Sequence, residues 1–176
     1  MIINLKTNNE LSGFYIIWDG STNLEKKGIY GISHLCEHLQ TKMIDHLQED
    51  FDRDGIEWNL WTSSNEICMY LCGLEEKVNK WKNVIVDLIF EFKITKEDFE
   101  NERKIVLEEY MDCFTDQTQS HILNLSRKLF GDFDPIGLKQ DLEKINFLDI
   151  INFWELQYSK PTKIIYQQIA QYYKKQ

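Results

Sequence analysis

The sequence predicts a single α+β domain, and three observations support this. Short runs rich in β-branched and aromatic residues, typical of strands, lie in the first, middle and last parts of the chain. Longer segments between them carry apolar residues at the three- and four-residue spacings of helices. The 176 residues contain no repeat, linker or low-complexity segment, so we expect one domain over residues 1–176.

The first half is predicted to hold a strand, a helix and a strand pair. FYIIWDGS (residues 14–21) is an aromatic, β-branched run ending in a turn signal, which favours a strand. Residues 24–31 are predicted as a loop. A helix from residue 32 to about 47 is indicated by regularly spaced apolar residues: Ile32, Leu35, Leu39, Met43 and Leu47. Residues 49–55 are expected to break this helix, and residues 56–74 to form two strands or one long bent strand.

The second half is predicted to be mainly helical. Apolar spacing indicates a helix over residues 76–92. Thr95 followed by Asp98 resembles a capping box, which predicts the start of another helix over about 96–114. The remaining expectations are a loop over 131–137, a helix over about 140–157 and a short strand near 163–170.

The composition disfavours several classes of partner. A formal net charge of −9 repels phosphate backbones and anionic lipid, so we expect neither nucleic acid nor a membrane as partner. The sequence has no apolar run of the length that crosses a bilayer. The first residues, MIINLKTNNE, lack the pattern of a signal peptide. We therefore expect a cytoplasmic protein with reduced cysteines.

GISHLCEHL (residues 31–39) contains the clearest chemical signal. His34 and His38 are four residues apart, so on a helix both imidazoles share one face and can bind one ion. Glu37 borders that face and would be the base that takes a proton from water in a catalytic zinc site. The spacing H-x-x-E-H is the inverzincin signature. The alternative is a helix that carries two ordinary histidines.

A catalytic zinc site needs a third protein ligand, which must come from elsewhere in the chain. In ENERKIVLEEY (residues 100–110), Glu102 and Glu109 are seven residues apart and stack on one side of the predicted helix, beside its apolar stripe. A carboxylate in that position costs free energy unless it is paired or binds a metal. Either glutamate could therefore complete the site, whereas Glu108 should face solvent.

Four segments together resemble the insulinase/pitrilysin metallopeptidases, which include the mitochondrial processing peptidases. They are WDGSTNLEKKGIYGISHLCEHL, GIEWNLWTSSNEICMY, ENERKIVLEE and DPIGLKQDLEKINFLDIINFWELQYSKPTKIIY. The resemblance implies one zinc-bearing half-domain of that fold, with an antiparallel sheet covered by helices on one face. It also implies roles: His34, His38 and Glu109 as zinc ligands, Glu37 as general base, and Glu102 as a catalytic-site acid that supports the ligands.

The resemblance further implies how substrate and partner would be bound. Asn59, Leu60, Trp61 and Thr62 would hold a peptide substrate as an added strand, although Leu60 stands where the family usually has alanine. Family members use two such half-domains, and the second supplies an arginine and a tyrosine that face the reacting carbonyl. We therefore expect a second half-domain chain, as a heterodimer more readily than a homodimer. Removal of a leader or maturation of a small peptide would suit such a protein.

Two other functions fit parts of the sequence. S-ribosylhomocysteine lyase also uses H-x-x-E-H in a short chain, with a cysteine as third ligand, and Cys113 in EYMDC would take that place. A non-catalytic peptide-binding module is the other alternative. Zinc content that depends on Glu109 or on Cys113 distinguishes the peptidase from the lyase, and hydrolysis distinguishes it from the module.

Overall fold

One mixed sheet organises the computed structural model, which describes residues 2–5, 11–130, 134–159 and 161–168. The strands are β1 (Ile2–Leu5), β2 (Leu11–Asp19), β3 (Glu57–Thr62), β4 (Glu66–Leu74) and β5 (Lys163–Gln168). Their order in the sheet is β1-β5-β2-β4-β3. Four strands pair antiparallel, as predicted, and β1 joins the edge in parallel with β5.

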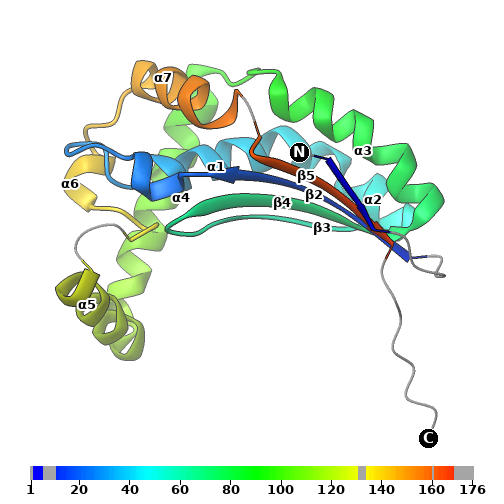
Figure 1. Ribbon diagram of the computed structural model, residues 1–176. Coiled ribbons are helices and arrows are strands. Elements are labelled where there is room, and N and C mark those ends of the chain that lie inside the picture. The colour runs from blue at the N-terminus through cyan, green and yellow to red at the C-terminus, as the bar shows by residue number, and fades with distance from the viewer. Residues whose placement is uncertain (1, 6–10, 131–133, 160, 169–176) are drawn as a thin grey trace, which may run out of the picture.

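Helices cover one face of this sheet. The larger ones are α1 (Ile32–Ile44), α3 (Glu75–Phe90), α4 (Lys96–Thr115), α5 (Gln117–Phe130) and α7 (Phe147–Tyr158). Figure 1 shows α1, α3 and α7 together over the same face, where α3 contacts β2 and β4, α7 contacts β2, and α1 contacts β3. The short elements are η1 (Ser21–Leu24), η2 (Asp45–Leu47), α2 (Gln48–Asp54) and α6 (Lys139–Leu142). This arrangement confirms the predicted fold class.

Alternating burial along the central strands explains why the helices cover that face. On β2, Phe14, Ile16 and Trp18 are buried under the helices, whereas the intervening Tyr15 and Ile17 are only partly buried. β4 repeats the same pattern with its own apolar residues. Full burial of each large apolar side chain is worth about 1.5–3 kcal/mol, so this face forms the core.

The capping box predicted for α4 is present. The Asp98 N–H donates to the Thr95 hydroxyl, and the Thr95 N–H donates to the Asp98 carboxylate, so two otherwise unpaired groups are satisfied. α4 then runs for 20 residues and packs against α1, α5 and α6. It therefore brings its acidic side chains against the helix that carries the histidines.

Residues 49–55 were expected to break the first helix, but the break comes earlier: α1 ends at Ile44, η2 follows, and a separate helix begins at Gln48. α2 spans Gln48–Asp54 and ends at Gly55, which has a left-handed φ of 66°. Phe51 is fully buried against the rings of Trp58 and Trp81. The packing of Phe51 outweighs the weak helix preference of this acidic segment.

Other boundaries differ from the prediction as well. The helix expected over 140–157 is two helices, α6 and α7, because Asn146 caps a new helix start at Phe147. Neither β1 nor α5 was predicted. The expected loop over 131–137 and strand over 163–170 lie partly outside the described residues, and the described parts are a turn and β5. Within the described part of the chain, no helix combines the length and apolarity needed to cross a bilayer.

Candidate metal centre

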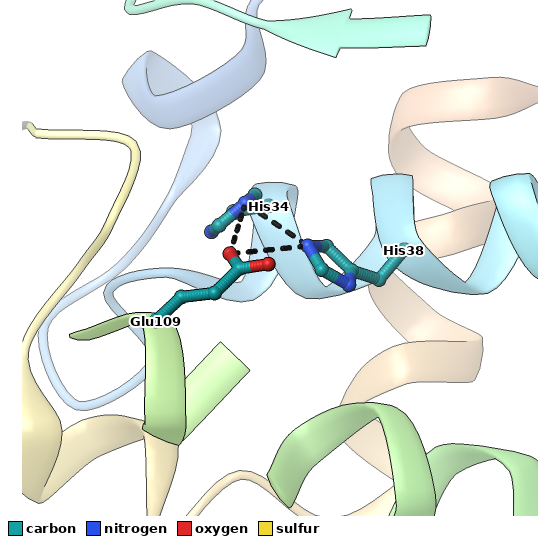
Figure 2. A group of neighbouring side chains, drawn as sticks. All are labelled: His34, His38 and Glu109. Atoms are coloured by element: carbon teal, nitrogen blue, oxygen red, sulfur yellow. Dashed lines mark hydrogen bonds and ion pairs between the residues drawn. The ribbon is translucent and has the colours of Figure 1, made fainter. Parts of the chain in front are cut away.

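His34, His38 and Glu109 converge on one point, as Figure 2 shows. Both histidines project from α1, and Glu109 reaches them from α4. The Nε2 atoms of the two imidazoles are 3.2 Å apart. Glu109 Oε2 lies 3.6 Å from His34 Nε2 and 3.4 Å from His38 Nε2. Two elements far apart in the sequence thus build a triangle of donor atoms.

The size of this triangle fits a zinc ion. Zinc binds imidazole nitrogen and carboxylate oxygen at about 2.0–2.2 Å, so two ligands at a tetrahedral angle lie about 3.3 Å apart. The three observed separations, 3.2, 3.4 and 3.6 Å, are close to that value. Two imidazoles and one carboxylate also leave the fourth tetrahedral position open, as catalytic zinc sites require.

Glu102 lies outside the triangle, next to the ring of His38. Its side chain is almost fully buried, and its Oε2 is 3.5 Å from Nδ1 of His38, the ring nitrogen that faces away from the triangle. A carboxylate in that place fixes the ring orientation and tautomer of a metal-binding histidine. Lys42 lies 4.0 Å from the other oxygen of Glu102 and offsets its charge. The geometry therefore suits Glu102 to support His38 rather than to bind the ion.

Glu37 is beside the histidines but outside the triangle. Burial raises the pKa of its carboxyl, while contact with Thr62 of β3 and the charge of His38 oppose that shift. A carboxyl with a raised pKa holds a proton more readily, which suits a general base. The helix α1, which carries Glu37 and both histidines, packs against β3, so this edge strand lies close to the triangle.

His34 is arranged to stay unprotonated. Burial, with a smaller effect from His38, lowers the pKa of its imidazole to about 4. Its Nδ1 is buried and has no hydrogen-bond partner among the described residues. A neutral imidazole is the form that binds metal, so His34 is ready to act as a ligand at neutral pH.

β3 presents the four residues expected to hold substrate. β3 is the last strand of the sheet on the side next to α1, so its outer edge is not paired with another described strand. Leu60 is buried and can meet a substrate only through its backbone, whereas Asn59 and Trp61 are exposed. The side chain of Asn59 accepts from the N–H of Leu60 at 2.9 Å. Together with Thr62 they form a free strand edge beside the metal centre.

Two neighbouring residues on α4 lie outside the group of donors. Glu108 is exposed, as the sequence predicted. Cys113, the ligand that the lyase alternative requires, is partly buried but is not in the group, which among the described residues consists of His34, His38 and Glu109. The structure thus brings together the donors expected of the peptidase.

The structure also contains a residue whose role the sequence reasoning missed. Glu25 is buried, and its carboxylate accepts hydrogen bonds from the N–H groups of Gly31 and Ser33 at the start of α1. Burial raises its pKa to about 7. The available signal was the glutamate that precedes the zinc motif in the family resemblance, but no local pattern assigned that residue a role.

The chain belongs to the insulinase family, peptidase family M16. The family model matches residues 12–134, a stretch that contains every donor described above. This membership contradicts the lyase alternative.

Relatives with curated descriptions agree with the family. The chain is 26% identical over 160 residues to an uncharacterised zinc protease, YmxG, of Bacillus subtilis; this match covers 85% of the chain and 39% of that relative. It is 23% identical over 172 residues to a probable β subunit of the mitochondrial-processing peptidase of Arabidopsis thaliana, covering 92% of the chain and 32% of the relative. The chain thus spans less than half the length of these relatives.

Solved structures show the same fold. A protease from Helicobacter pylori superposes with a TM-score of 0.83 at 17% identity, over 96% of this chain and 44% of that one. The first half of the periplasmic protease PqqL from Escherichia coli superposes with a TM-score of 0.74 at 16% identity, over 97% of this chain and 40% of that one. The chain therefore has the fold of one part of such proteases.

Proposed function

We propose that this chain is the zinc-bearing half of a metallopeptidase that hydrolyses peptides. The observation that carries the proposal is the triangle of His34, His38 and Glu109, whose donor separations match zinc coordination. Bound zinc would polarise the peptide carbonyl and make water more acidic. The Bacillus relative is named a zinc protease, which supports the choice of metal.

Glu37, Glu102 and His34 would have different roles in hydrolysis. Glu37 takes the proton of the attacking water and passes it to the leaving amine, which its raised pKa favours. Glu102 holds the His38 ring in place through Nδ1. Burial keeps the donor His34 unprotonated.

A peptide substrate would bind as an extra strand along the outer edge of β3. Main-chain hydrogen bonds to an edge strand hold a peptide in extended form with little regard to its sequence. Because β3 packs against α1, the helix that carries Glu37, a strand bound along β3 would pass close to the base. Removal of a leader or maturation of a small peptide is the class of reaction that we propose.

A second half-domain would complete the active site. Hydrolysis places negative charge on the carbonyl oxygen, and loss of one donor to such an oxyanion costs about two to three orders of magnitude in rate. The chain covers 39% of its Bacillus relative and 44% of the Helicobacter protease, so both have a further part that could supply that donor. We propose a separate chain of similar fold in that role, more readily as a heterodimer than as a homodimer.

The test is hydrolysis by the zinc-loaded chain and by Glu37→Gln, with mixed unstructured peptides as substrate and mass spectrometry as readout. Glu37→Gln removes the base and leaves the three donors, so it should keep zinc and lose cleavage. We expect slow cleavage by the wild-type chain alone and a large increase when a matching half-domain is added. Equal cleavage by both proteins would contradict the role of Glu37. Zinc binding without cleavage, even beside a matching half-domain, would favour the peptide-binding module.

A further inference from the structure

The first turn of α1 is hydrogen-bonded to a buried carboxylate, that of Glu25. Glu25 follows η1, and its side chain is 7% exposed. Oε2 accepts from the N–H of Gly31 and Oε1 from the N–H of Ser33, both at 2.9 Å. The first N–H groups of a helix have no acceptor within the helix, so one carboxylate satisfies two donors that would otherwise be unpaired.

This contact is directly next to the metal centre. Ser33 precedes His34, the first donor of the triangle, and His38 follows one turn later on the same helix. A rotation or fraying of the first turn would move His34 relative to Glu109, which comes from another helix. The position of Glu25 thus bears on the geometry of the triangle without contact between Glu25 and its donor atoms.

The other side of the same turn is fixed by close packing. Gly31 has a left-handed φ of 97°, and a Cβ there would lie 2.9 Å from Leu142 and 3.1 Å from the Cα of Gly137. The N–H of Tyr30 donates to the carboxylate of Asp141 at 3.2 Å. The start of α1 is therefore held both by this packing and by the hydrogen bonds that Glu25 accepts from Gly31 and Ser33.

Besides accepting hydrogen bonds, the Glu25 carboxylate places a negative charge at the N-terminus of α1. The N-terminus of a helix carries the equivalent of about half a positive charge, which repels a cation bound to its first turn. An ionised Glu25 offsets that charge, and its burial means that water screens the effect only weakly.

We propose that Glu25 is a positioning residue of the metal centre, which holds the first turn of α1 so that His34 and His38 face Glu109 and which offsets the helix charge there. The inference rests on the proposed function, because it takes the triangle to bind zinc. It adds a residue that lies outside the H-x-x-E-H motif and outside the set of donors.

The test compares Glu25→Gln with Asp149→Asn at pH 8. Glu25→Gln keeps the shape of the side chain but removes its charge and one acceptor. Asp149 accepts from the N–H of Asn146 in the capping box of α7, a helix that carries no donor of the triangle, so Asp149→Asn is a matched loss of a helix-capping carboxylate. For each protein we would measure zinc affinity by chelator competition, the visible spectrum of the Co²⁺ form, and the free energy of unfolding.

We expect Glu25→Gln to weaken zinc binding about tenfold, the size of effect seen when supporting residues of metal sites are lost. Its Co²⁺ spectrum should also change, because the donors are displaced. Asp149→Asn should lower stability and leave both metal readouts unchanged. Should Glu25→Gln fail to fold, Glu25→Asp keeps the charge but cannot reach both N–H groups, and it should show a smaller loss of affinity.

Two results would overturn the inference and are distinguishable from each other. In the first, the wild-type protein binds zinc, and Glu25→Gln (or its substitute Glu25→Asp) has the same zinc affinity and Co²⁺ spectrum. This result would exclude Glu25 as a positioning residue and leave the proposed function standing. A wild-type protein that binds no zinc would overturn the proposed function and this inference together.

Discussion

The carboxyl of Glu25 couples the stability of the fold to pH. Burial raises its pKa from 4.5 to about 7; hydrogen bonds from Gly31 and Ser33 lower it, and the charge of Asp141 adds to the rise. The folded protein therefore holds this proton more tightly than the unfolded chain. Its contribution to stability is fully present below pH 4.5 and is lost as the pH rises through 7.

We accordingly predict that metal-free wild-type protein loses stability relative to Glu25→Gln between about pH 5 and pH 8. The difference in the free energy of unfolding should change by up to about 3 kcal/mol over that interval. His34, whose pKa is lowered to about 4, acts with the opposite sign, but it does so in both proteins and so cancels. Urea denaturation with a chelator present gives the two pH profiles, and parallel profiles would show that Glu25 does not titrate as described.

Single residues differ in how far the sequence could reveal them. His34 and His38 could be predicted as a pair because helix geometry places positions i and i+4 on one face, and Glu37 borders that face. Glu109 was ambiguous with Glu102 from the helix alone, and the structure separates them: Glu109 faces both Nε2 atoms, whereas Glu102 faces Nδ1 of His38. The role of Glu25 depends on a turn that no local pattern describes.

At the scale of elements, a contact between two glycines joins the start of α1 to the turn before α6. Gly137 has a φ of 71°, and a Cβ there would clash with the Cα of Gly31 and the carbonyl of Tyr30. Arg127 of α5 donates to the carbonyl of Gly137 at 2.6 Å. The turn is thus held between two helices with no room for a side chain.

Gly137→Ala should therefore destabilise the protein by at least about 2 kcal/mol more than Gly55→Ala. Gly55 is the matched control because its φ of 66° is nearly the same, yet nothing lies within 4 Å of its missing Cβ. The control should cost only the strain of a left-handed alanine, about 1 kcal/mol. Thermal or urea unfolding of both variants checks this, and equal losses would mean that the glycine contact can relax.

Whole elements were predictable where an amphipathic period or a cap marks them. The helix at residue 32 and the capping box at Thr95 are examples. α2 was missed because its short acidic sequence has no clear helical period, whereas the packing of Phe51 against Trp58 and Trp81 is a tertiary contact. α5 was missed because few of its residues are buried, and three of its large apolar side chains, Ile122, Leu125 and Leu129, are more than half exposed. β1 is only four residues long, and its pairing partner is at the other end of the chain.

At the scale of the whole molecule, the fold is that of one part of larger proteases. The chain superposes on 44% of the Helicobacter protease and on 40% of the first half of PqqL, and in each case nearly all of this chain is matched. The family resemblance predicted this fold because its motifs occur in the same order along the chain. The residues of the proposed second half-domain could not be predicted from the 176 residues of this sequence.

Co-expression with candidate half-domains of the same family should give a one-to-one complex. The complex should cleave peptides about two to three orders of magnitude faster than this chain alone, because the proposed partner would supply the oxyanion donor. Light scattering of the purified complex measures its stoichiometry. Full activity of a strictly monomeric chain would contradict the need for a partner.

Metal content of the purified chain is the decisive measurement for the proposed zinc centre. Elemental analysis would compare the wild-type protein with Glu109→Gln, with the exposed neighbour Glu108→Gln as control, and with Cys113→Ala. We predict one zinc per chain, lost or strongly reduced in Glu109→Gln and retained in the other two variants. Absence of zinc from the wild-type protein, or zinc that depends on Cys113 and not on Glu109, would refute the assignment of His34, His38 and Glu109 as its ligands.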